Sequence, residues 1–331
     1  MYNRRVWHGL IQICGGIFLI IAASWLVTYS SDRQLEKNVR PGWHMVRAPG
    51  NLQTVALYQG SVWTGGVNGL FRFDPVTVEP LPLPQGSGYL GVVHDLLTDN
   101  QGILWVGHQQ GVSRFDGMKW ATYDCLPARK SNPVTALLQD KEGAIWLGLQ
   151  DGVFCKGATI EQHHVLNMGP IDVLYQDNKE RIWAGSSDPR RGGLACFEGG
   201  AWKSYSSNDG LLHPSVNCVT ETRDGTLWIG TGFANAGGAN YATSAGILAA
   251  MTRNDGLAGD KVRQIYEDRA GNLWFCSEYD GVAIFRGGKR VAVLTTADGL
   301  AGQEVKKIVQ DETGIYWLAT DQGLNRISAV F

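Results

Sequence analysis

The sequence predicts an all-β fold, a single seven-bladed β-propeller that follows one N-terminal transmembrane helix. Three observations carry this prediction. The chain has 331 residues with 43 glycines and 12 tryptophans, and only 18% of its residues are charged. That composition is typical of many short strands joined by tight turns. A tryptophan motif also recurs at a nearly constant spacing, and one long apolar run stands near the amino terminus.

The amino-terminal segment is expected to cross a membrane. No Lys, Arg, Asp or Glu stands between Arg5 and Asp32, and residues 9–29 would span roughly 32 Å as a helix, enough to cross a hydrocarbon core. Arg4 and Arg5 precede the run, which places the amino terminus in the cytoplasm and the rest outside. The expected parts are an anchor, a polar linker and a propeller: residues 1–30, 31–42 and 43–331.

A cleaved signal peptide is the alternative for this segment, because Ala22, Ala23 and Ser24 suit a small-residue cleavage site. The apolar run continues through Val27, which is longer than most signal cores. Lipidation of Cys14 is disfavoured, because this residue lies deep within the apolar run. A retained anchor predicts a single-pass protein of the bacterial inner (plasma) membrane with a cytoplasmic amino terminus. Every route places the propeller in the periplasm or outside the cell.

The tryptophan repeat sets the number of blades. Consecutive repeat tryptophans are 42, 41, 37, 45, 46 and 43 residues apart. A period near this length is that of one four-stranded propeller blade. The seven repeat tryptophans, which we interpret as structural, are Trp63, Trp105, Trp146, Trp183, Trp228, Trp274 and Trp317.

Each repeat also contains a turn signal ahead of its tryptophan. Glycine stands three residues before the tryptophan in every repeat except one, which has Glu180, and aspartate stands six residues before it except at Leu57 and Thr222. An aspartate side chain can accept a hydrogen bond from the backbone two residues on, and glycine permits a positive φ. The pair therefore predicts a hairpin turn that leads into the strand carrying the tryptophan.

The last repeat lacks an outer strand of its own. Outer strands are expected to begin after glycine and to carry an aromatic residue, as in "GAWKSY" at 200–205. The stretch "PGWHMVRA" at 41–48 has the same appearance but precedes the first blade. We therefore expect residues 43–48 to pair with the last blade and to close the ring, which removes exposed strand edges.

Three segments resemble the two-component regulator propeller repeat. They are "NDGLLHPSVNCVTETRDGTLWIG" at 208–230, "NDGLAGDKVRQIYEDRAGNLWFC" at 254–276 and "ADGLAGQEVKKIVQDETGIYWLA" at 297–319. The resemblance implies the periplasmic sensing part of histidine kinases or other signalling proteins, several of which respond to oligosaccharides. The 331 residues show no kinase or other output domain, so we expect the propeller to act through a neighbouring protein.

Polar residues follow the first aliphatic residue of six expected inner strands. By alternation they share one side of their strands and would surround the mouth of the central channel. Such a ring would hold a polyhydroxylated, oligosaccharide-like or carboxylated ligand, with the two cations facing an acid group. The competing interpretation is the wet, polar mouth of an ordinary propeller. The candidate residues are His94, Thr135, Asp172, Asn217, Arg263 and Lys306.

Two connections are longer than their counterparts and lie in adjacent blades, at residues 186–192 and 231–237. Variable polar loops on a rigid scaffold are a usual place for binding. The competing interpretation is ordinary variation in loop length. The candidate ligand or partner residues are Asp188, Arg190, Arg191, Phe233 and Asn235.

Catalytic and metal-binding signals are weak. The sequence has no HExxH, CxxC pair, phosphate-binding loop or nucleophile elbow. His94, His108 and His213 would be candidates in a propeller lyase, but their spacing selects none. Adjacent His163 and His164 point to opposite faces of a strand. We therefore expect no catalytic residue, metal or cofactor.

These observations favour a non-enzymatic ligand or protein recognition module that is sensor-like and works through a membrane partner. An accessory or assembly subunit that docks on a larger membrane complex is the alternative, and a propeller lyase or hydrolase is a lesser one. The formal net charge of −2 argues against nucleic acid as a partner. The six cysteines suggest no particular disulfide pairing.

Overall fold

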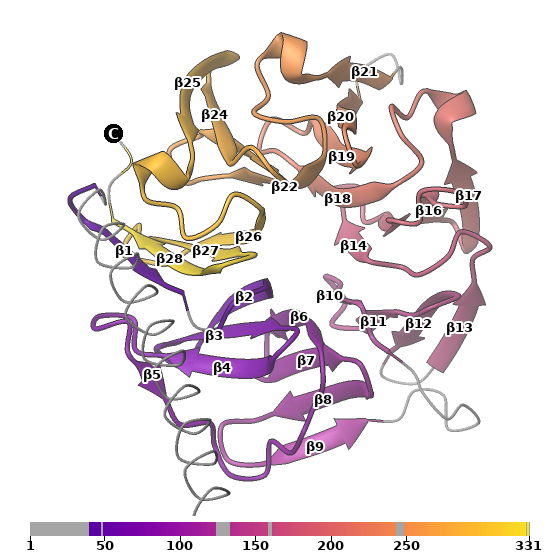
Figure 1. Ribbon diagram of the computed structural model, residues 1–331. Helices are drawn as coiled ribbons and strands as arrows, with labels where there is room; N and C mark the ends of the chain where they lie inside the picture. The colour runs from indigo at the N-terminus through magenta and orange to yellow at the C-terminus, as the bar shows by residue number, and fades with distance from the viewer. Residues whose placement is uncertain are drawn as a thin grey trace, which may run out of the picture.

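A computed structural model describes residues 40–47, 49–123, 133–157, 161–242, 248–328 and 330. These residues form seven four-stranded antiparallel sheets arranged around a central axis (Figure 1). The predicted all-β fold and its seven blades are therefore confirmed. The expected anchor and its alternatives lie outside the described residues. Among the residues described, no helix is long and apolar enough to span a membrane.

Each blade runs from an inner strand beside the axis to an outer strand at the rim (Figure 1). From the inside outwards, the first three blades are β2 (Leu52–Tyr58), β3 (Ser61–Gly66), β4 (Gly69–Phe73) and β5 (Pro80–Leu81); β6 (Val93–Thr98), β7 (Leu104–His108), β8 (Gly111–Phe115) and β9 (Trp120–Tyr123); and β10 (Ala136–Gln139), β11 (Ile145–Gly148), β12 (Gly152–Lys156) and β13 (Glu161–Val165).

The next three blades are β14 (Val173–Gln176), β15 (Ile182–Ser186), β16 (Gly193–Glu198) and β17 (Ala201–Tyr205); β18 (Val216–Glu221), β19 (Leu227–Phe233), β20 (Ala236–Ala242) and β21 (Leu248–Met251); and β22 (Val262–Glu267), β23 (Leu273–Ser277), β24 (Val282–Arg286) and β25 (Lys289–Leu294). The last is β26 (Val305–Gln310), β27 (Tyr316–Thr320), β28 (Gly323–Ile327) and β1 (Trp43–Val46). Short 3-10 turns precede the last three blades: η1 (Ser207–Asp209), η2 (Arg253–Asp255) and η3 (Thr296–Asp298).

The ring is closed by a strand from the start of the described chain. β1 pairs antiparallel with β28, so that Trp43 lies opposite Ile327 and Val46 opposite Leu324. This strand ends two residues earlier than the predicted 43–48. Trp43 is buried against the core between the last two blades, which includes Leu318 and Ile327. Both ends of the propeller thus contribute to one blade (Figure 1).

The repeat aspartates hold their turns and their tryptophans at the same time. Asp268 is fully buried, and its Oδ1 accepts hydrogen bonds from the backbone N–H groups of Ala270 and Asn272, at 2.9 and 2.8 Å. Its Oδ2 accepts from the indole of Trp274 at 3.0 Å and from the hydroxyl of Tyr316, in the next blade, at 2.8 Å. The turn was predicted, but the indole bond was not. Equivalent indole bonds are made by Asp99, Asp140, Asp177 and Asp311.

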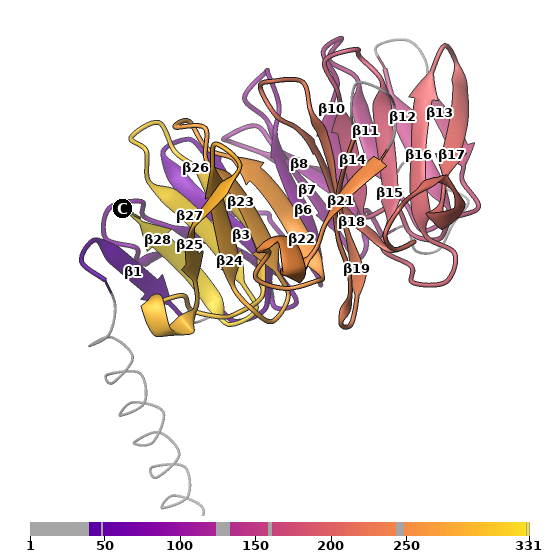
Figure 2. The ribbon, with the colours of Figure 1, turned by 90° about the horizontal axis from the view of Figure 1, so that it is seen from above.

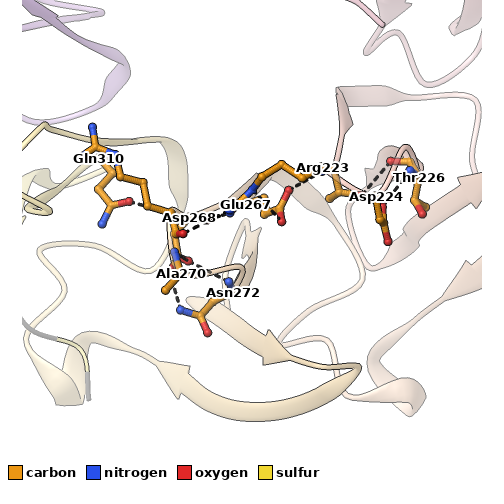
Figure 3. Close-up of polar contacts among 10 residues, drawn as sticks. Arg223, Asp224, Thr226, Glu267, Asp268, Ala270, Asn272 and Gln310 are labelled. Carbon is orange, nitrogen blue, oxygen red and sulfur yellow. Dashed lines mark hydrogen bonds and ion pairs between the residues drawn. The ribbon is translucent and has the colours of Figure 1, made fainter. Parts of the chain in front are cut away.

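A second hydrogen bond joins neighbouring blades. The backbone N–H of the residue after the turn aspartate, or after Thr222 in the fifth blade, donates to the Gln or Glu side chain that ends the next inner strand. The backbone N–H of Arg223 donates to Glu267 at 2.7 Å, and Gln310 accepts from the residue after Asp268. Figure 3 shows these residues. The same bond links Asn100 to Gln139, Lys141 to Gln176 and Asn178 to Glu221. Blades two to seven are therefore joined pairwise through side chains as well as by packing.

Glu180 adopts the backbone conformation that the other repeats reserve for glycine. Its φ is 65°, close to the 68° of Gly60 and the 73° of Gly102. A residue with a Cβ atom is strained in this left-handed region. The fourth blade therefore keeps the turn geometry of the repeat despite the substitution.

Replacing Trp43 with alanine should test the closure of the ring. The change leaves a cavity between the last two blades and weakens the pairing of β1, so we expect the free energy of unfolding to fall by roughly 3–5 kcal/mol. Chemical denaturation of the part of the chain after the predicted anchor measures this. His44→Ala, at an exposed position on the same strand, is the matched control. Equal stability of the Trp43 and His44 variants would contradict a structural role for β1.

Acid should unfold the propeller by protonating the repeat aspartates. Burial alone would raise the pKa values of Asp177, Asp268 and Asp311, but the hydrogen bonds they accept outweigh burial and hold each pKa below the ordinary 3.8. A lowered folded-state pKa stabilises the fold above the unfolded-state value, and this stabilisation is lost as pH falls through the folded-state value. We expect the melting temperature to drop steeply below about pH 4. A melting temperature that stays constant down to about pH 2.5 would refute this account.

Glu180→Gly should stabilise the fourth blade. Removing the Cβ atom relieves the strain at positive φ, and we expect a gain of about 1 kcal/mol, partly offset by the greater chain entropy of glycine. Glu180→Ala keeps the Cβ atom and should give no such gain. Thermal melts of both variants measure the change in stability. An equal gain in melting temperature for both would show that the gain comes from removing the carboxylate.

Candidate functional site: a polar cavity at the centre of the ring

The start of each inner strand turns a polar side chain towards the axis. In five blades the pairing with the second strand slips by one residue at this point. Such a bulge takes one residue out of the ladder and re-aims its side chain. The residues at the bulges are Gln53, His94, Asn217, Arg263 and Lys306, whereas Thr135 and Asp172 lie just before the first pairs of β10 and β14.

The structure brings the six predicted ring residues together around one cavity. The cavity has a volume of about 480 Å³ and lies at the centre of the ring, with lining residues from all seven blades. Gln53 completes the ring from the first blade, a position that the sequence reasoning missed. It could have been found by applying the same rule to Leu52 and Gln53.

The two cations of the ring line the cavity, but both are paired with a carboxylate of the protein, which the sequence did not predict. Arg263 lies 2.6 Å from one oxygen of Glu304, and Lys306 lies 3.5 Å from the other. The ammonium group of Lys306 also donates to Asn51 at 2.7 Å. Burial lowers the pKa of Lys306, while the nearby Glu304 carboxylate acts to raise it. Both positive charges are therefore already compensated by the protein.

Two other residues that line the cavity, His94 in the second blade and Asn217 in the fifth, carry polar atoms without a protein partner in the described chain. The amide nitrogen of Asn217 donates to the carbonyl of Gly232 at 3.0 Å, but its Oδ1 atom is buried without a partner within the described chain. The Nε2 atom of His94 is likewise buried and unpaired. Burial also lowers the pKa of His94, which favours the neutral imidazole. Neither atom has a hydrogen-bond partner within the described chain, so each would gain a hydrogen bond if a ligand group reached it.

Asp172 connects the ring of polar residues to the loop at residues 186–192. Its carboxylate accepts hydrogen bonds from the backbone N–H of Ser187, at 3.2 Å, and from the Ser187 hydroxyl. The carbonyl of Ser187 accepts from the Ser215 hydroxyl at 2.9 Å. Burial raises the pKa of Asp172, against the effect of these bonds. The loop therefore begins at the rim of the cavity.

Two further charged residues, Asp95 and Lys307, line the cavity beside the ring residues. Asp95 accepts hydrogen bonds from the Thr54 hydroxyl at 3.2 Å and from the Leu137 N–H at 3.1 Å. Its carboxylate is 3.7 Å from the ammonium group of Lys307, which belongs to the last blade. Tyr175 and Tyr266, among other residues, also line the cavity. Sequence reasoning missed Asp95 and Lys307, although each stands one position after a ring residue.

The predicted loop residues are not gathered in this site. Asp188 stabilises its own turn by accepting from the N–H groups of Arg190 and Arg191, both at 2.8 Å. Arg191 lines a separate cavity of about 380 Å³ near Met168 and Tyr205. The candidate residues of this loop therefore lie outside the central cavity.

The other predicted loop, at 231–237, is mostly strand. It forms the extended ends of β19 and β20 around a turn at Ala234 and Asn235. The ammonium group of Lys261 lies 5.6 Å from the ring centre of half-exposed Phe233. Asn235 lines a cavity of about 360 Å³ between the fifth and sixth blades.

The other histidines have structural surroundings. His108 is buried, its Nε2 lies 2.9 Å from the Ser113 hydroxyl, and burial lowers its pKa to about 4. His213 accepts a hydrogen bond from the Ser215 N–H at 3.0 Å. His163 lies 3.4 Å from Asp151. Where the structure describes the chain, no three metal-ligating side chains come together, and Cys155, Cys196, Cys218 and Cys276 are free thiols.

Comparison with known families identifies the repeat. Residues 129–151, 210–233 and 256–279 match the family described as "Two component regulator propeller". The prediction that this chain carries two-component regulator propeller repeats is confirmed. No curated protein matches the chain.

Solved structures share the fold. The extracellular domain of a protein assigned to a hybrid two component system of B. thetaiotaomicron has a TM-score of 0.74 and 19% identity, covering 88% of this chain and 41% of that one. This chain thus spans about two fifths of that protein. A catalytically inactive virginiamycin B lyase from Staphylococcus aureus with quinupristin has a TM-score of 0.67 and 14% identity, covering 87% and 99%. YCF48 bound to D1 peptide has a TM-score of 0.65 and 12% identity, covering 88% and 98%. At these identities the likeness shows the fold alone.

Proposed function

We propose that this propeller is a non-enzymatic recognition module whose central cavity binds a small, uncharged ligand rich in hydroxyl groups. The observation that supports the proposal is the pair of unpaired buried atoms, His94 Nε2 and Asn217 Oδ1, on residues that line the cavity. An unmade buried hydrogen bond costs about 1–3 kcal/mol. A hydroxyl group both donates and accepts, so it can satisfy either atom.

The charges around the cavity favour an uncharged ligand. Arg263 and Lys306 share Glu304, and Lys307 lies beside Asp95. An acidic ligand would have to compete with carboxylates that are already in place. The cavity volume of about 480 Å³ falls within the usual range of small-molecule sites, about 300–1,000 Å³.

The proposal includes a location and a partner. Residues 1–30 would anchor the chain in the bacterial plasma membrane with the propeller outside it, as the apolar run and the preceding arginines favour. A membrane protein or a multi-subunit membrane complex would bind the propeller and respond to whether its cavity holds a ligand. The described chain enters the ring at its outer edge through β1, the outermost strand of the last blade (Figure 2). Co-purification of a kinase would support the sensor role, whereas a stoichiometric multi-subunit partner would favour an accessory subunit.

Substitutions of His94 and Asn217 should weaken ligand binding. A panel of uncharged sugars and sugar alcohols is titrated by calorimetry into the wild-type chain and into the variants His94→Phe and Asn217→Ala. We expect each variant to lose about tenfold or more in affinity, the equivalent of one buried hydrogen bond. His44→Phe, on the exposed face of β1, is the matched histidine control and should bind like the wild type.

Wild-type affinity in both cavity variants would contradict the proposed site. Chemical conversion of a bound sugar by the wild-type chain would show a lyase or hydrolase instead of a recognition module.

A further inference from the structure

Glu304 stands at a position where no other blade has an acid. It stands two residues before the ring residue Lys306. The residues two positions before the other ring residues are Asn51, Val92, Pro133, Pro170, Ser215 and Lys261. Asp321 fixes its backbone from both sides. The Glu304 N–H donates to the Asp321 carboxylate at 3.1 Å, and the Glu304 carbonyl accepts from the Asp321 N–H at 3.0 Å. The chain therefore holds this carboxylate in place beside the ring.

The carboxylate of Glu304 is divided between two cations from different blades. Arg263 comes from β22 and Lys306 from β26, and they lie 2.6 and 3.5 Å from its two oxygens. The three side chains are only 23%, 8% and 14% exposed for Arg263, Lys306 and Glu304. Shielding from water strengthens these interactions. Two positive charges that line the cavity thus depend on one negative charge.

We propose that Glu304 determines the class of ligand that the central cavity accepts. By neutralising Arg263 and Lys306 it excludes anions, which would otherwise bind there through charge-assisted hydrogen bonds from the guanidinium fork and the ammonium group. An anion that entered the wild-type cavity would place its charge beside that of Glu304, which is unfavourable. This inference rests on the proposed function, because it concerns the same cavity.

The variant Glu304→Gln tests the inference directly, because the amide keeps the size of the side chain and removes its charge. Inorganic phosphate is titrated by calorimetry into the full-length wild type and the variant near pH 7 and at low salt. We expect the variant to bind phosphate at least about tenfold more tightly than the wild type. Combining Glu304→Gln with Arg263→Gln should abolish the gain, which distinguishes phosphate bound by the Arg263 guanidinium from phosphate bound elsewhere.

The matched control is Glu278→Gln. Glu278 is also ion-paired, to Lys261 at 2.7 Å, and has a similar exposure of 12%, but its partner Lys261, unlike Arg263 and Lys306, does not line the central cavity. Removing the charge of Glu278 should leave phosphate affinity at the wild-type level. Circular dichroism checks that each variant is folded, and Glu304→Ser replaces Glu304→Gln if the latter does not fold.

Equal phosphate affinity in the wild type and the folded Glu304 variant would overturn the inference, as would an equal gain in Glu278→Gln. A gain confined to Glu304→Gln supports it, even if the wild type binds none of the uncharged sugars, in which case only the proposed function fails. Conversely, sugar binding by the wild type without any gain of phosphate binding in the variant would sustain the proposed function and reject the role of Glu304.

Discussion

The carboxylate of the repeat aspartate is the interaction on which the rest of the ring depends. One oxygen closes the turn and the other holds the indole of the tryptophan, as Asp268 does for Trp274. Trp274 is fully buried among side chains of the next blade, such as Ile308 and Leu318. A turn, a strand and a contact between blades are thus fixed by a single side chain. Because this arrangement recurs in five blades, the scaffold is rigid before any functional residue is considered.

The starts of the inner strands depart from this regular scaffold, and these departures indicate where functional side chains lie. The bulges near Val93, Val216 and Val262, among others, take one polar residue per strand out of the ladder. Such a residue contributes little to sheet pairing, so its side chain is available for other contacts. The unpaired atoms of His94 and Asn217 lie at these positions. The residues that form the repeat turns and those at the bulges around the centre are therefore different sets.

The electrostatic character of the cavity depends on pairs that cross from one blade to another. Arg263 and Glu304 belong to neighbouring blades, whereas Asp95 and Lys307 belong to the second and the last. In each case a residue that looks free in its own strand is compensated by a distant part of the chain. A ring with several cations is consequently close to balanced in charge, which favours an uncharged ligand over an acidic one.

The sequence by itself determined the repeat length, the seven blades, the turns and the positions that surround the axis. These follow from local rules, since the aspartate turn and the alternation of a strand act over a few residues. Even Glu180 keeps the turn that its neighbours require. The tertiary structure alone decided which charges are neutralised, because the approach of Glu304 to Arg263 depends on how two blades pack. It also decided that Arg191 and Asn235 line separate cavities, because loop direction depends on contacts such as that of Ser187 with Asp172.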